Sequence, residues 1–333
     1  MKLGNTRRTL LIAAGMGALS AALPSLAQQK SKVWRIGYLG SGSRQTELDI
    51  GRTPAFLQGM KELGYVEGKH FVFESRFADG HNERLSALAG ELVQLNADVI
   101  VTSGVAASHA AQRTASTIPI VVTVVPDPVR DGLALSLAKP GGNITGLSSG
   151  TAEVIQKHVE LLVTVRPQIA RIAVLLNPAN AGSPPLLLSV QAAAQRSGRQ
   201  VLPVAASNPE DLEHGFAFMT RNGADAVIVL VDALFRQQRR QIAGLALKHR
   251  LPSSFANIEY SDAGGLIVYA ANTIENFRRA AIFVDKILKG AKPGELPFEL
   301  PTRFQLVINR KTANALGLTI PQELLLRADR VID

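Results

Sequence analysis

The sequence predicts an α/β fold of two similar lobes, each with a parallel sheet flanked by helices. Runs rich in valine and isoleucine alternate with segments of helical periodicity along the chain, a pattern typical of buried parallel strands covered by helices. The chain has 333 residues, of which 46% are hydrophobic, so it can bury the cores of two lobes. A weak internal repeat supplies the third observation.

The repeat relates two pairs of segments. "RIGYLGSG" (Arg35–Gly42) is echoed by "RIAVLLNPAN" (Arg171–Asn180), and "LNADVIVTSG" (Leu95–Gly104) is echoed by "NGADAVIVLVD" (Asn222–Asp232). Each copy continues into a helical pattern and then a further strand. This predicts two Rossmann-like lobes of one topology, with a ligand cleft beyond the carboxyl ends of their strands.

The individual elements follow from the same patterns. Helices are expected at 82–95 and 153–165, where apolar residues recur with helical spacing. Strands are expected, in chain order, at 34–39, 70–77, 98–102, 118–125, 171–176, 200–205, 225–231 and 265–270.

Three crossings should connect the lobes. Pro126 ends the strand before it, since proline cannot donate to the ladder, and the turn at 140–143 leads to a first crossing at 144–149. A second is expected near 255–265 and a third near 304–309. Lobe 1 would then comprise 28–147 plus about 258–300, and lobe 2 would comprise 148–257 plus about 301–333.

The amino terminus has the pattern of a signal peptide over residues 1–27. Basic residues precede an apolar run from Leu10 to Leu23, and Ser25 and Ala27 are small residues suited to cleavage. The pair Arg7 and Arg8 fits twin-arginine export as well as the general secretory route. The apolar run is too short to span a bilayer.

Composition excludes several classes of function. The chain has no cysteine, which excludes a disulfide framework, a thiol nucleophile and a lipid-modified cysteine. Its formal net charge is +9, but the densest basic run, 235–241, lies in an amphipathic pattern and indicates a solvated helix face instead of a nucleic-acid surface. No histidine pair has metal-ligand spacing, so neither a metal nor a cofactor is expected.

Five segments, in chain order, resemble one known family. They are "DPV" (127–129), "PGGNITG" (140–146), "ELLVTVRPQIARIAVLLNP" (160–178), "AAIFVDKILKGAKPGELP" (280–297) and "FQLVINRKTANALGLTIP" (304–321). The chain is therefore similar to the periplasmic substrate-binding proteins of ABC importers, in the group that includes the tryptophan- and tyrosine-binding type.

The resemblance implies a type I periplasmic binding protein fold, in which two lobes joined by three hinge strands close on a ligand. It further implies a monomeric receptor in the periplasm that binds an amino acid or a related carboxylate and delivers it to an inner-membrane ABC permease. Such a receptor is not an enzyme.

The first-lobe site residues are expected at strand ends. Ser103 is predicted to cap a helix and Gly104 to permit close approach, so that the N–H groups of Val105 and Ala106 face an anion. Ser41 and Ser43, after the first strand, are short polar side chains suited to hydrogen-bonding a ligand.

Further candidates follow other strands. Asp232 either pairs with a ligand ammonium or caps the next helix, and Asp127 either fixes a turn or lines the cleft. Asn177 is a polar group at a strand end, and Glu259, like Arg44, is a weaker candidate of the same kind.

Two other functions remain open from sequence alone. The same fold could serve a periplasmic sensor that reports ligand occupancy to a membrane signalling protein. "GLSSG" (146–150) also matches the G-x-S-x-G pattern of serine hydrolases, with Ser148 as the nucleophile.

Overall fold

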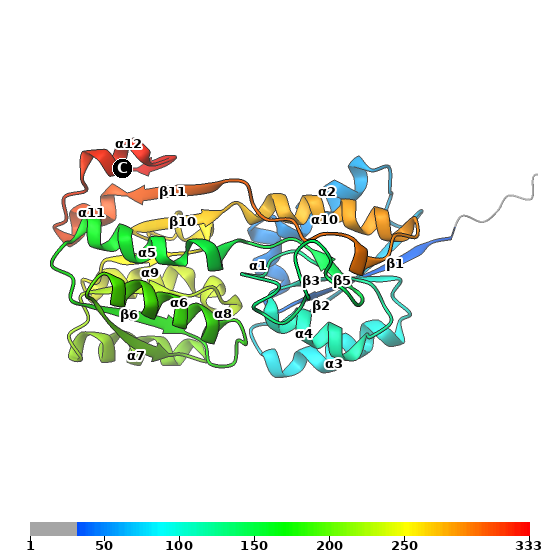
Figure 1. The fold of residues 1–333 in the computed structure, drawn as a ribbon, viewed down its shortest axis with the longest axis horizontal. Coiled ribbons are helices and arrows are strands. Elements are labelled where there is room, and N and C mark those ends of the chain that lie inside the picture. Colours follow the sequence, from blue (N-terminus) through cyan, green and yellow to red (C-terminus); the bar gives the residue numbers. More distant parts are fainter. Residues whose placement is uncertain (1–31) are drawn as a thin grey trace, which may run out of the picture. The chain divides into compact units, whose positions relative to one another are not determined.

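A computed structural model describes residues 32–333, and the signal peptide predicted at 1–27 lies outside this range. The first lobe contains a five-stranded parallel sheet in the order β2-β1-β3-β4-β5 (Figure 1). Its strands are β1 (Trp34–Gly40), β2 (Phe71–Phe77), β3 (Val99–Ser103), β4 (Ile120–Val122) and β5 (Ile144–Gly146). Its helices are α1 (Arg44–Asp49), α2 (Arg52–Glu62), α3 (Leu85–Gln94), α4 (Val105–Thr114) and α10 (Thr273–Leu288).

The second lobe contains a seven-stranded sheet in the order β12-β11-β10-β9-β8-β6-β7, parallel except where β10 meets β11. Its strands are β6 (Arg171–Leu176), β7 (Gln200–Ala205), β8 (Ala226–Val229), β9 (Ser253–Phe255), β10 (Ile267–Ala271), β11 (Phe304–Asn309) and β12 (Arg330–Ile332). Its helices are α5 (Thr151–Val165), α6 (Ser183–Arg196), α7 (Pro209–Arg221), α8 (Ala233–Gln237), α9 (Arg239–Lys248), α11 (Arg310–Leu316) and α12 (Gln322–Arg327).

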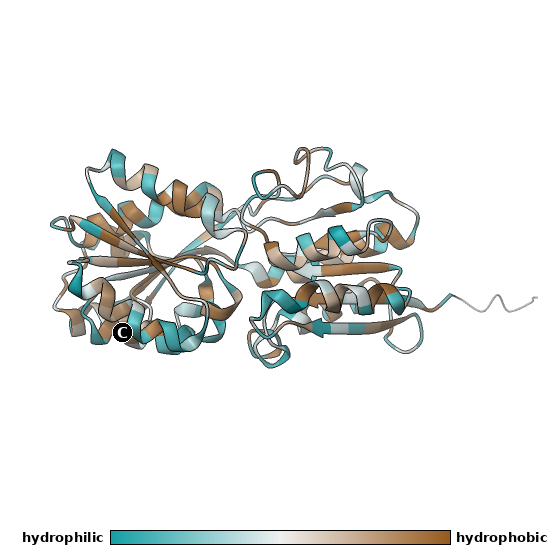
Figure 2. Cartoon of the chain, turned by 90° about the horizontal axis from the view of Figure 1, so that it is seen from below, coloured by the Kyte–Doolittle hydropathy of each residue, from teal (hydrophilic) through white to brown (hydrophobic). Residues whose placement is uncertain are grey.

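The two sheets confirm the predicted α/β fold of two lobes. The order β2-β1-β3-β4-β5 in the first lobe recurs as β7-β6-β8-β9-β10 in the second, which is the repeat seen in the sequence. Apolar strands form the centre of each lobe between amphipathic helices (Figure 2), and a buried cluster lies on each face of each sheet. No helix in 32–333 is long and apolar enough to cross a membrane.

Helix α10 returns to the first lobe and packs against α2 there. Its apolar face, spaced at helical intervals, includes Phe277, Ala281 and Val284, which lie in one buried cluster with Phe56 and Met60 of α2. Asn272 caps the start of α10 by accepting a hydrogen bond from the Ile274 N–H at 3.2 Å. This helix therefore fixes the first-lobe end of the second crossing.

The second crossing lies later than the sequence predicted. Residues 255–265 contain the end of β9 and a short 3-10 helix (Ile258–Tyr260), and they lead into β10, which pairs with β9 in the same sheet. This segment instead forms a loop between neighbouring strands, where Gly265 packs against Phe255. The crossing follows β10 near Asn272, so residues 258–271 belong to the second lobe.

The other two crossings run side by side. Residues 147–150 and 299–303 both take the chain from the first lobe to the second, and the Ser148 N–H donates to the Glu299 carbonyl at 2.8 Å. The predicted third crossing near 304–309 is strand β11 itself, because the connection precedes it.

Close packing of α2 on α10 gives a test of this arrangement. A Cβ on Gly59 would lie 2.2 Å from the Arg278 carbonyl oxygen, so Gly59→Ala should lower the free energy of unfolding by about 1–3 kcal/mol in urea denaturation. Gly90→Ala in α3 is a matched control with no atom within 4 Å of the new methyl group, and it should stabilise by roughly 0.5–1 kcal/mol. Equal stabilities would contradict the helix contact.

Candidate functional site

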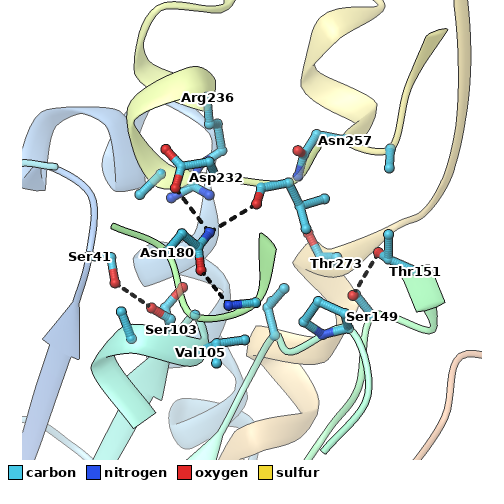
Figure 3. A pocket seen from close by; sticks show the side chains of 18 of the residues that line it. Ser41, Ser103, Val105, Ser149, Thr151, Asn180, Asp232, Arg236, Asn257 and Thr273 are labelled. Atoms are coloured by element: carbon cyan, nitrogen blue, oxygen red, sulfur yellow. Dashed lines mark hydrogen bonds between the residues drawn. The ribbon is translucent and has the colours of Figure 1, made fainter. Parts of the chain in front are cut away.

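A cavity lies between the lobes at the carboxyl ends of their central strands (Figure 3). The space in and around it amounts to about 720 Å³, which includes space open to solvent. The first lobe contributes Ser41, Asn82, Ser103, Gly104, Val105 and Ala106. The second contributes Asn180, Gly182, Asp232, Arg236 and Asn257, and the crossings contribute Ser149, Thr151 and Thr273.

The first-lobe wall is the amino terminus of α4. The N-cap residue is Gly104, with φ of 96°, and not Ser103 as predicted; no side chain caps the helix. Ser103 cannot cap because it is the last residue of β3, one position too early. Gly104 takes a backbone conformation that other residues rarely adopt, and this turns the start of α4 toward the cavity.

The second-lobe wall includes another helix that begins without a side-chain cap. A Cβ on Gly182, the N-cap residue of α6, would lie only 3.1 Å from the Val105 side chain of α4. The Val105 side chain at the start of α4 therefore packs against the start of α6, whose first N–H groups, Gly182 and Ser183, donate to Asn180. The uncapped start of α4 is the helix terminus that favours an anion here.

Asp232 is the only acidic side chain among the described residues that line the cavity. It caps α8 by accepting hydrogen bonds from the N–H groups of Leu234 at 2.9 Å and Phe235 at 3.3 Å. Asn177 and Asn180 also donate to it, at 3.3 and 3.0 Å. Burial raises the pKa of Asp232, and these hydrogen bonds oppose the rise.

Asn180 organises the loop after β6 and was missed by the sequence reasoning. Its amide donates to Asp232 and to the Val231 carbonyl, and its oxygen accepts from the Gly182 N–H at 3.0 Å. The predicted residue, Asn177, instead lies buried behind Asp232, where its oxygen accepts from the Ala179 N–H. Both are asparagines of the segment "NPAN", so composition could not distinguish them.

Two buried ion pairs cross between the lobes beside the cavity. Arg236 of α8 contacts Glu47 of α1 at 2.6 Å, and Arg52 of α2 contacts Glu259 of the second lobe at 3.0 Å. Arg52 also lies 3.7 Å from Glu47 and donates to Thr273 at 3.1 Å. The four charges form one alternating chain across the lobes.

The sequence assigned Arg236 to a solvated helix face, which is wrong. The basic run breaks into two helices at Gln238, so Arg236 belongs to the short α8 and points inward, while Arg240 on α9 is exposed. Arg52 was missed because nothing in its local pattern distinguishes a buried arginine from an exposed one. Glu259 pairs with Arg52 but does not line the cavity.

Two other candidates support loops outside the cavity. Ser43 caps α1 by accepting from the Thr46 N–H at 3.2 Å. Asp127 accepts from the N–H groups of Val129 and Arg130, both at 3.0 Å, which is the turn-fixing role considered from sequence.

Ser148 is held by the backbone and has no catalytic partner. Its hydroxyl lies 3.0 and 3.1 Å from the carbonyl oxygens of Val125 and Pro126, and it accepts from the Gly150 N–H at 2.9 Å. No described histidine forms a hydrogen bond with it, so the geometry gives the hydrolase interpretation no support. The described residues also contain no group suited to hold a metal ion.

The fold and cavity define a two-lobed ligand-binding protein. Residues 52–332 match the family model described as ABC transporter substrate binding protein, and the chain belongs to this family. It is therefore the substrate-binding component of an ABC transporter and not an enzyme, as the sequence predicted. This membership also sets aside the sensor interpretation.

Named relatives share most of the chain. A tyrosine-binding protein of Clostridioides difficile is 25% identical over 264 residues, which cover 79% of this chain and 75% of the relative. A conserved domain protein of Vibrio cholerae has a solved structure with a TM-score of 0.83 and 28% identity, covering 90% of this chain and all of that one. An ABC domain of Streptococcus pneumoniae in complex with L-Trp has a TM-score of 0.82 and 24% identity, with the same coverage.

Asp131, in the loop after Asp127, should make stability depend on pH. Burial raises the pKa of the Asp131 carboxyl to about 6, and the charge of Asp127 adds to the rise. A raised folded-state pKa gives stability that is present below the ordinary pKa and lost as pH rises through about 6. Asp131→Asn keeps an acceptor for the Asp127 N–H and should be more stable than the wild type by roughly 1–3 kcal/mol near pH 8.

The advantage of Asp131→Asn should shrink toward about pH 4, as measured by urea unfolding across pH. Asp262→Asn is the control, because that side chain is 79% exposed and should change stability little at either pH. A difference that stays constant with pH would exclude titration of Asp131 as the cause.

Proposed function

We propose that this substrate-binding protein captures an amino acid, or a related small carboxylate, between its lobes by hinge closure. The observation that carries the proposal is one cavity lined by an uncapped helix terminus from one lobe and a buried carboxylate from the other. The start of α4 suits a ligand carboxylate, and Asp232 suits a ligand ammonium. An α-amino acid presents both groups.

The relatives support the same ligand class. One is named for tyrosine and another is described in complex with L-Trp, so amino-acid binding is established among proteins that resemble this chain. The polar groups come from both lobes, so a ligand can contact all of them only when the cleft is closed. Closure then couples ligand capture to a change in shape.

We further propose that the protein acts in the periplasm as a monomer and presents its closed form to an inner-membrane permease. The export signal predicted at 1–27 supports this location. Family membership supports an ABC permease as the partner. The free energy for transport would come from the ATPase of that permease.

A binding measurement tests the proposal. Isothermal titration of the purified chain against amino acids and small carboxylates should find a saturable ligand, which should also raise the melting temperature by mass action. Asp232→Asn retains the helix cap, since asparagine caps as well as aspartate, but it removes the charge facing the ammonium. Its affinity for the best ligand should fall by about 10- to 100-fold, the loss expected for a charged hydrogen bond.

The exposed Asp262→Asn serves again as the control and should bind with unchanged affinity. The melting temperature of unliganded Asp232→Asn shows whether the variant is folded. Wild-type affinity in a folded Asp232→Asn would exclude the ammonium role, and failure of every amino acid and carboxylate to bind would overturn the proposed function.

A further inference from the structure

The wall of the cavity contains no aromatic side chain among the described residues. Aromatic residues adjoin it in sequence but point away: Phe235 precedes Arg236, and Phe255 precedes Ala256, yet both rings lie in the buried core of the second lobe. The apolar part of the wall consists of small aliphatic groups such as Ala106, Val124 and Ala233. A ligand ring would find no aromatic partner for stacking here.

The charges around the cavity are balanced before any ligand side chain is considered. The described lining residues carry two cations, Arg52 and Arg236, and each is already paired with a buried glutamate. The remaining charge is Asp232, which a ligand ammonium would neutralise. The ligand carboxylate would meet the uncapped start of α4. A charged ligand side chain would therefore be buried without an opposite charge, which is strongly unfavourable.

Unlike the charges, the hydrogen-bonding groups of the lining residues are not all paired. The Nε and Nη1 atoms of Arg52 and the Nε atom of Arg236 are buried and have no hydrogen-bond acceptor. The Oδ1 atom of Asn82, also in the wall, is a buried acceptor without a donor. Arg52 and Arg236 are 0% and 7% exposed, so solvent does not replace the missing partners.

We propose that the ligand is an amino acid with an uncharged polar side chain, a carboxamide above all. A carboxamide adds no net charge, accepts hydrogen bonds through its oxygen and donates through its nitrogen. Its oxygen would accept from the unpaired guanidinium N–H groups of Arg52 or Arg236, which makes these arginines specificity-determining residues. The inference rests on the proposed function, since it concerns the side chain of an amino acid bound in the same cavity.

Isosteric ligands provide the test. Isothermal titration should give L-glutamine or L-asparagine an affinity at least about tenfold higher than that of its acid, L-glutamate or L-aspartate. Each amide should also bind at least about tenfold more tightly than its apolar near-isostere, L-methionine or L-leucine, because apolar groups leave the arginine donors unpaired. L-tryptophan and L-tyrosine should bind more weakly than either amide.

Arg236→Lys tests the role of the guanidinium. Lysine keeps a positive charge near Glu47 but has no Nε donor, so the preference for amide over apolar ligand should fall by about three- to tenfold. The ratio of two affinities is measured within one variant, so a changed cost of lobe closure cancels from it. Arg240→Lys makes the same replacement on the exposed start of α9 and should leave the ratio unchanged.

The outcomes distinguish failure of the inference about the ligand side chain from failure of the proposed function. Tightest binding of an aromatic, acidic or aliphatic amino acid would overturn the inference while leaving an amino-acid receptor. If Arg236→Lys changes neither the ratio of amide to apolar affinity nor the binding of any ligand, Arg236 is not a specificity-determining residue. Absence of binding by every amino acid would instead mean that the proposed function itself is wrong.

Discussion

The contact between the two lobes buries four charges together, one arginine and one glutamate from each lobe. Arg236 of the second lobe contacts Glu47 of the first, and Arg52 of the first contacts Glu259 of the second. An isolated buried charge is costly, and removing one partner of a buried pair costs about 3–5 kcal/mol. Loss of either interlobe pair is therefore costly, and the two pairs favour the arrangement that places Asp232 of one lobe opposite α4 of the other.

The crossings limit how the lobes can move relative to each other. Two crossing segments are joined where Ser148 donates to Glu299, and Asn276 of α10 donates to the carbonyl oxygens of Thr123 and Ser148 at 3.1 and 3.0 Å. Away from this hinge, Arg130 of the first lobe reaches α6 and donates to Ser189 at 2.9 Å. Buried hydrogen bonds therefore join the segments at the crossings, and an exposed hydrogen bond joins the lobes at the rim.

The sequence predicted the parts of the fold and site that depend on local pattern. Strand periodicity and the internal repeat gave the two lobes, and strand ends gave Ser41, Gly104 and Asp232 as lining residues. Arg52, Asn180 and Arg236 were missed because their positions depend on the helix break at Gln238 and on packing between distant elements. The internal repeat indicates where the second crossing lies. The first crossing follows β5, and β10 is the counterpart of β5, so the chain should also cross after β10.

In the proposed mode of binding, the side chains that join the lobes also select the ligand. Arg52 and Arg236 join the lobes through one nitrogen atom of each guanidinium group, while other nitrogen atoms of the same groups are buried without a hydrogen-bond acceptor. Buried N–H groups without acceptors would destabilise a closed form, whereas water would hydrate the arginines in an open form. A ligand that accepts hydrogen bonds from these groups would remove that cost. Such a ligand must shift the population toward the closed form by the free energy of those hydrogen bonds. Different ligands would then populate the closed form to different extents, and the permease could distinguish them by that difference.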